Sequence, residues 1–169
     1  MQAAMARSLK THFRIVARAP DGKIKWVDEF DNLVVNVGLD NSLEEHLRGV
    51  AYTAAWYVGL TDGTPTVVAG DTMAAHGGWV EVVAYDEAVR QTLTLGAVAG
   101  QSTDNVGNEA VFTISVNNTT IGGAFVATSN VKGGAVGILY GGGAFTAADK
   151  TLDDDDTATV TVTCTAAAA

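Results

Sequence analysis

The sequence predicts an all-β protein: an antiparallel β-sandwich, jelly-roll-like, with an N-terminal β-hairpin arm and one short helix. Hydrophobic residues alternate with polar ones along most of the chain, which is the pattern of half-buried strands. The predicted strands are short and recur roughly every ten residues, between turns rich in glycine, asparagine and aspartate. Only one segment has a helical pattern, so the strand and helix alternation of parallel sheets is not seen in the sequence.

The first predicted element is a β-hairpin near the N-terminus. Hydrophobic and charged residues alternate through 13–18, and the pattern resumes over 24–27. Residues 20–22 between these runs read Pro-Asp-Gly, a combination that favours a tight turn. A short apolar run over 33–37 follows, and we expect Gly38 to end it.

The single predicted helix spans residues 40–48. Ser42 and Glu45 have the spacing of a capping box at its start, and Gly49 is placed to stop it. Its apolar residues recur at every fourth position and therefore share one face: Leu39, Leu43 and Leu47.

Beyond the helix, the sequence predicts further strands over 56–60, 79–84, 91–97, 110–116, 121–127, 136–140 and 157–165. Residues 61–70 are expected to form a loop, and residues 71–76 one helical turn. The last strand has the most regular pattern. Threonines occupy its odd positions, and the other face carries Ala158, Val160, Val162 and Cys164.

Charge and pattern together divide the chain into a basic arm and hairpin (1–38), a sandwich body (39–165) and a flexible C-terminal tail (166–169). The first 18 residues contain four basic side chains and no acidic one: Arg7, Lys10, Arg14 and Arg18. Residues 51–169 contain three basic and twelve acidic side chains, and the whole chain has a net charge of −9. Such a body would repel phosphates, so we expect no nucleic-acid partner.

Several function classes are not expected from the sequence. Cys164 is the only cysteine, so no intrachain disulfide can form. We find neither an apolar run of membrane-helix length nor an export signal, and expect a soluble intracellular product without a membrane partner. No serine lies in a nucleophile elbow, and no glycine-rich phosphate loop precedes a helix. We therefore expect no enzymatic activity, no catalytic residue and no cofactor.

Three weaker candidate sites have simpler structural interpretations. Four consecutive aspartates, 153–156, could bind calcium, but adjacent residues of an extended chain point apart, so we expect a solvated turn and no metal. His76 is expected in a turn before the next strand. The aromatic side chains could line a sugar platform, yet we expect most of them in the core: Trp56, Tyr57, Trp79, Tyr85, Phe125, Tyr140 and Phe145.

Most of the chain resembles virion structural proteins of tailed bacteriophages. The resemblance rests on residues 56–60, on the Thr64-Pro65 pair, on residues 69–73, and on His76, Gly78, Trp79, Glu81, Tyr85 and Arg90. It extends to an opening pattern with Asp21, Gly22, Lys23, Trp26, Asn32, Leu33, Val34, Asn36 and Gly38, to the Ala124-Phe125 pair, and to the final strand over 159–164. The sequence departs from that pattern at 153–156, where relatives more often have Gly-Asp.

This resemblance implies a capsid decoration, or cement, protein. Such proteins are frequently jelly rolls that sit on the outside of the head as homotrimers or homodimers and bridge major capsid subunits, after assembly in the host cytoplasm. The charge count then places the contact in the arm. We expect Arg7, Lys10, Arg14 and Arg18 to pair with capsid carboxylates, and the backbone of residues 11–16 to add a strand to a partner's sheet.

Two alternatives remain open at this point. The chain could be a tail or head-fibre component, with the arm as its anchor. It could also be a carbohydrate-binding β-sandwich module that uses Trp56, Trp79 and Tyr85.

Overall fold

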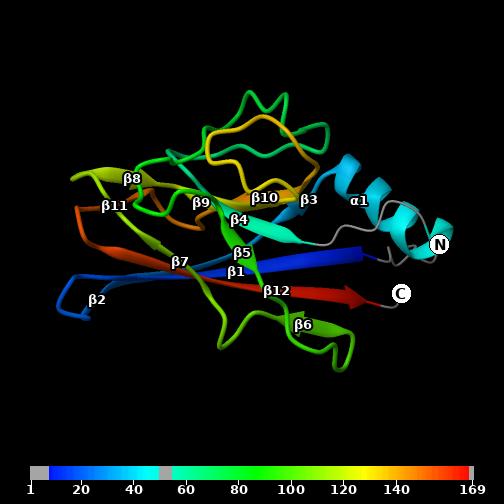
Figure 1. Ribbon diagram of the computed structural model, residues 1–169, viewed down its shortest axis with the longest axis horizontal. Helices are drawn as coiled ribbons and strands as arrows, with labels where there is room; N and C mark the ends of the chain where they lie inside the picture. Colours follow the sequence, from blue (N-terminus) through cyan, green and yellow to red (C-terminus); the bar gives the residue numbers. More distant parts are fainter. Residues whose placement is uncertain (1–7, 50–54, 168–169) are drawn as a thin grey trace, which may run out of the picture.

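The computed structural model of the protein describes residues 8–49 and 55–167. Two antiparallel sheets face one another (Figure 1). The sheet with the longer strands, called the larger sheet below, has the order β2–β1–β12–β6, and β7 pairs with β12 beside β6. Its strands are β1 (Ser8–Arg18), β2 (Ile24–Asp31), β6 (Ser102–Asp104), β7 (Ala110–Thr113) and β12 (Thr157–Ala167). The predicted fold class, an all-β antiparallel sandwich, is confirmed.

The smaller sheet has the order β3–β10–β9–β4–β5: β3 (Leu33–Val34), β4 (Trp56–Thr61), β5 (Gln91–Leu93), β9 (Gly123–Ala127) and β10 (Leu139–Ala144). A separate two-stranded sheet joins β8 (Thr119–Ile121) to β11 (Lys150–Leu152). The strands β3, β6 and β11 are only two or three residues long, and the sequence pattern did not predict β6 or β11.

The predicted hairpin forms, but β1 lies inside the larger sheet. It pairs with β2 on one side and along its whole length with β12 on the other. Both backbone edges of residues 12–18 are therefore occupied within the chain. Our expectation that residues 11–16 add a strand to a partner's sheet is wrong for this reason. The strand β12 also extends through Ala167, two residues into the predicted tail, because Ala166 N–H donates to the Gln101 carbonyl.

The main core fills the space between the two sheets. Alternate residues of β1 and β12 point into it, as the strand periodicity predicted. The rings of Phe13 and Phe30 stack at 5.2 Å between centroids, and Tyr85 packs edge-on against Phe112 at 5.0 Å. Other buried members are Ile15, Val58, Leu60, Ile114, Val126, Val160 and Val162.

A second, smaller core lies on the other face of the smaller sheet, beneath loops that form a third layer (Figure 1). Phe125 points to this side, whereas its neighbours in β9 point into the main core. Trp79 packs on it at 4.9 Å between ring centroids. A Cβ at Gly59 would overlap the Phe125 ring, so this position needs glycine.

Two predicted elements are not formed in this loop layer. Residues 79–84 make only an isolated bridge, between Thr61 and Glu81, and residues 71–76 form a bridged turn, not a helical one. The side chain of Trp79 is held down on the sheet face, and this packing outweighs the strand propensity of the segment.

The helix begins earlier than predicted. It consists of α1 (Asn36–Leu43) and a π-helical continuation, η1 (Glu44–Arg48). Gly38 lies inside the helix and does not end a strand. Glycine is needed here because a Cβ would overlap the carbonyl of Tyr140 in β10. The predicted capping box is not formed, since the Ser42 hydroxyl donates to the Gly38 carbonyl at 3.0 Å. Gly49 does stop the helix, with a positive φ of 66°.

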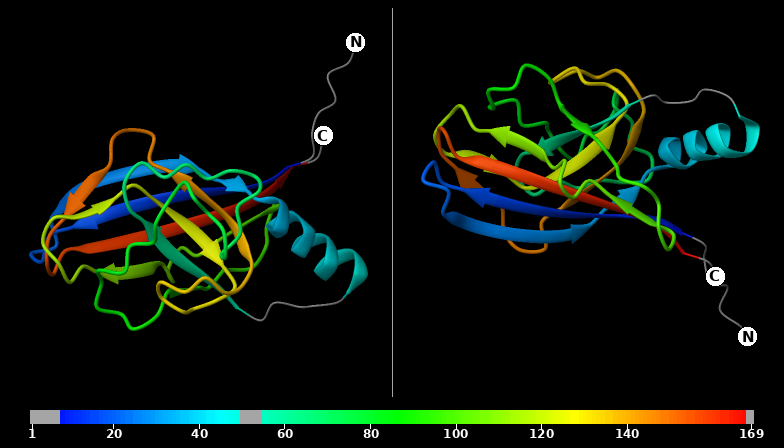
Figure 2. Two further views of the ribbon diagram at one scale, coloured as in Figure 1. Left: turned by 90° about the horizontal axis from the view of Figure 1, so that it is seen from above. Right: turned by 60° about the horizontal axis from the view of Figure 1, so that its bottom comes forward.

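The helix projects beyond one end of the sandwich, near the start of β1 and the end of β12 (Figure 2). Within the part of the chain that the structure describes, no helix is both long and apolar enough to span a bilayer.

Candidate functional site

The loops above the smaller sheet present exposed valines. Val80 and Val83 come from the loop before β5, and Val131 and Val136 from the loop between β9 and β10. We call these four residues the valine platform. A shallow depression of about 290 Å³ joins the two loops, lined by Val80, Val83 and residues 133–135, with His76 and Glu81 at its side. The depression thus joins Val80 and Val83 to residues 133–135, which lie between Val131 and Val136 in a segment some fifty residues further along the sequence.

A wholly buried arginine holds the two loops together. Arg90 forms a bidentate ion pair with Glu81, with Nε–Oε1 at 2.8 Å and Nη2–Oε2 at 2.7 Å. Its Nη1 donates to the Ser129 carbonyl and its Nη2 to the Gly134 carbonyl, each at 2.8 Å. Glu81 Oε2 also accepts from the Gly133 N–H at 2.9 Å. This network satisfies the buried charges and fixes the shape of the platform.

Lys132 adds a second link between the loops. Its ammonium group donates to the carbonyls of Tyr85 and Glu87, each at 2.8 Å, and lies 4.2 Å from the centre of the Tyr85 ring. Burial raises the pKa of Tyr85, so its phenol stays neutral.

The Trp79 side chain supports the same layer from below. Its indole N–H donates to Asp71 Oδ2 at 3.2 Å, and the His76 ring stacks on it at 3.8 Å between centroids. His76 therefore lies in the turn where we expected it, as a packing residue. Four of the residues that carry the sequence resemblance support the valine platform from beneath: His76, Trp79, Glu81 and Arg90.

The alternative of an aromatic sugar platform is not supported by the structure, and Trp79 and Tyr85 lie in the core, as we expected of most aromatic residues. Trp79 is 4% exposed and Tyr85 is 2% exposed, and the two belong to different cores. Trp56 is half-buried in a pocket at the end of the sandwich, packed edge-on against Tyr140. The three rings therefore cannot make one exposed surface for a glycan.

The basic residues predicted to bind a partner lie on β1 or before it. Lys10 and Arg14 point to the solvent side of the larger sheet, and Arg14 Nε pairs with Glu29 Oε1 at 3.0 Å. Arg18 donates to the Gly22 carbonyl at 3.1 Å, and Arg7 lies outside the described residues. The structure thus places an acidic neighbour beside Arg14, and part of the predicted positive charge is compensated within the sheet.

We expected the four aspartates at 153–156 to form a solvated turn. The structure contradicts this expectation in part. Asp156 is buried, and the Lys25 ammonium bonds it at 2.5 Å and Asp153 at 3.2 Å. The hydrogen bond to Asp156 raises the pKa of Lys25, and a backbone hydrogen bond from Asn118 lowers the pKa of Asp153. The run thus ties β2 to the start of β12. Over residues 8–49 and 55–167, no three histidine, cysteine or acidic side chains are grouped as metal ligands would be.

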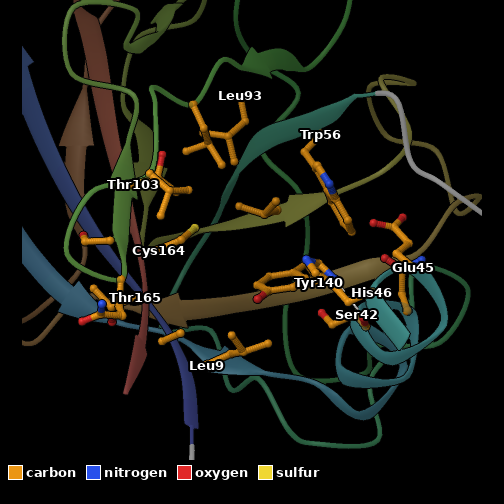
Figure 3. Close-up of a pocket in the computed structure, with 17 residues that line it drawn as sticks. Leu9, Ser42, Glu45, His46, Trp56, Leu93, Thr103, Tyr140, Cys164 and Thr165 are labelled. Atoms are coloured by element: carbon orange, nitrogen blue, oxygen red, sulfur yellow. Dashed lines mark hydrogen bonds between the residues drawn. The ribbon is translucent and has the colours of Figure 1, made fainter. Parts of the chain in front are cut away.

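An apolar pocket of about 390 Å³ opens between the two sheets below the helix (Figure 3). Its walls are mostly hydrophobic, with polar groups from the helix at one side: Leu9, Trp56, Leu93, Tyr140 and Cys164, with Ser42, Glu45 and His46. Burial raises the pKa of the Cys164 thiol, and raises that of Tyr140 to about 12. Both groups are therefore neutral near pH 7, and the pocket can accept an apolar group but offers no thiolate nucleophile.

Neither the valine platform nor this pocket was predicted from the sequence. The exposed valines lie in segments read as a strand or as a loop, and nothing local indicates that they meet. Arg90 was a weak signal in the sequence, because it is an isolated charge next to predicted strands. A buried arginine needs a charged or polar partner, so its position indicated that another segment would pack against it.

The sequence matches no protein-family model, and a search among curated proteins finds no relative.

Proposed function

We propose that this chain is a bacteriophage capsid decoration protein, which binds the outside of the head and stabilises contacts between major capsid subunits. We base this on the valine platform. Exposed apolar surface on soluble proteins marks sites of protein contact when it is contiguous. Here it stands on loops already fixed by Arg90 and Lys132, so binding would cost little ordering of the chain.

The sequence resemblance supports the same class of protein. Three of its residues, Trp79, Glu81 and Arg90, lie in the frame that supports the platform, and such a frame gives a contact surface a fixed shape. The proposed partners are the major capsid protein and further copies of this chain, on the virion surface, after assembly in the host cytoplasm. A contact of Arg7, Lys10, Arg14 and Arg18 with capsid carboxylates is the alternative to the valine platform, and the salt dependence of head binding distinguishes the two.

The test is sedimentation of the purified protein with heads assembled without it. Val80→Asp combined with Val83→Asp places two charges on the platform without touching the buried frame, because both side chains are at least half exposed. We expect affinity for heads to fall at least about tenfold. Val106→Asp is the matched control, since Val106 is 66% exposed and lies in the turn between β6 and β7.

Unchanged binding by the double variant would contradict the platform as the contact. Binding of the wild-type protein to isolated tails but not to heads would instead support a tail or fibre component. Circular dichroism and the thermal midpoint of each variant establish that the fold is retained.

A further inference from the structure

The apolar pocket between the two sheets has the size of a small-molecule site. Its volume of about 390 Å³ falls within the range of ligand pockets in proteins, which is about 300 to 1,000 Å³. Leu93 and Val126 of the smaller sheet line it and are buried, whereas Leu9 and Val98 line it and are exposed. The pocket therefore reaches from solvent toward the main core, and its apolar walls can take up an aliphatic chain.

The helix α1–η1 presents polar residues to this pocket. Ser42, Glu45 and His46 line it from the helix side (Figure 3). The same helix has leucines that could have filled an apolar cavity, but these are exposed: Leu39, Leu43 and Leu47. The pocket thus combines apolar walls from the sheets with hydrogen-bonding groups from the helix. This combination matches a molecule with an aliphatic chain and one polar end.

A buried hydrogen-bond acceptor on the helix wall has no partner. Asn41 lines the pocket and is 6% exposed, and its Oδ1 accepts no hydrogen bond within the part of the chain that the structure describes. Buried polar atoms in folded proteins normally have a partner, either in the protein or in a bound molecule. A hydroxyl group bound beside Asn41 would donate the missing hydrogen bond. The wall therefore favours a ligand whose polar end is a donor.

The charges around the pocket favour an uncharged ligand. No lysine or arginine lies among the described residues that line it, so a carboxylate or phosphate would be buried beside Glu45 without a counter-ion. Glu45 already interacts within the chain, so an ammonium group would lose its hydration without gaining an unengaged carboxylate. The side chains of Cys164 and Tyr140 add no charge, because burial raises the pKa of each.

We propose that this pocket is a binding site for a neutral aliphatic amphiphile of the medium-chain alcohol class. The aliphatic chain lies between the two sheets, and the hydroxyl group lies at the helix and donates to Asn41. The pocket is at the end of the sandwich below the helix, whereas the valine platform lies on the loops over the smaller sheet (Figure 1). The two sites are separate, so this proposal does not rest on binding to heads.

Calorimetric titration of the full chain with 1-octanol near neutral pH tests the ligand class. We expect saturable binding at one site, and sodium octanoate and octylammonium chloride to bind at least about tenfold more weakly because their charges must be desolvated. The affinity should rise about fourfold with each methylene added from 1-hexanol to 1-octanol, as burial of the chain predicts. Absence of saturable 1-octanol binding, or tighter binding of either charged analogue, would overturn the proposal.

Cys164 reports on the location of the ligand, because it lines the pocket and is the only cysteine in the chain. Bound 1-octanol should slow the alkylation of Cys164 by N-ethylmaleimide in proportion to occupancy. Cys164→Phe places a ring in the pocket and should abolish binding, whereas Val106→Phe, at an exposed site in the turn between β6 and β7, should not. Circular dichroism establishes that both variants are folded. An unprotected thiol at saturating 1-octanol would contradict the assigned site.

Asn41→Leu tests the position of the hydroxyl group, since it removes the acceptor while keeping a side chain of similar shape. The wild-type protein should bind 1-octanol more tightly than 1-chlorooctane, which cannot donate a hydrogen bond. The variant should lose this preference while it still binds both compounds. A preference that is unchanged in the folded variant would contradict the hydrogen bond to Asn41.

Discussion

At the scale of single residues, the platform depends on one buried ion pair. Arg90 is fully buried and Glu81 almost so, and together they bond three backbone groups of the loop between β9 and β10. A buried pair of this kind contributes less to stability than its geometry suggests, because both charges lose their hydration. Loss of one partner is different, since it leaves the other charge buried and unpaired.

We therefore expect Arg90→Met to lower the free energy of unfolding by about 3 kcal/mol, as measured by urea denaturation. Arg48→Met is the matched control. Arg48 pairs with Glu44 in an exposed position, and its removal should cost less than about 0.5 kcal/mol. Combining Arg90→Met with Glu81→Gln should restore part of the loss. Equal small effects at both arginines would mean that the pair is not a support of the loop layer.

At the scale of elements, the sequence predicted best where one local rule agreed with the packing. The strand β12 alternates threonine with buried residues, and the hairpin turn has its Gly22 at a positive φ of 82°. The start of the helix was missed because Gly38 reads as a stop. In the fold this glycine is needed for close approach to β10, a requirement that only the distant partner strand reveals.

The position of β1 has a direct consequence for truncation. Removal of residues 1–18 deletes a strand between β2 and β12, together with the buried side chains of Phe13 and Ile15. We expect that variant to lose its cooperative thermal transition and its β-sheet signal in circular dichroism. Removal of residues 1–7 spares every described strand and should leave both intact. A folded protein after the longer deletion would show that residues 8–18 act as a detachable arm.

At the scale of the whole molecule, the candidate site is a product of topology. Its residues come from two loops held over the smaller sheet. Arg90, which is paired with Glu81, joins these loops by donating hydrogen bonds to the carbonyls of Ser129 and Gly134. The composition and the alternation of hydrophobic residues were enough to predict a sandwich. They carry no information on which loops meet, so the platform could not be predicted from them.

The nature of this surface predicts how head binding responds to salt. The four side chains that define the platform are apolar, so a contact made by them would not depend on attraction between opposite charges. We expect binding to heads to persist when sodium chloride is raised from about 0.1 M to about 0.5 M, where exposed charges are strongly screened. Lys10→Gln combined with Arg18→Gln should then bind like the wild-type protein at both salt concentrations. Release of the wild-type protein by salt, together with weak binding by this variant, would place the contact on the basic residues of β1 instead of on the valines.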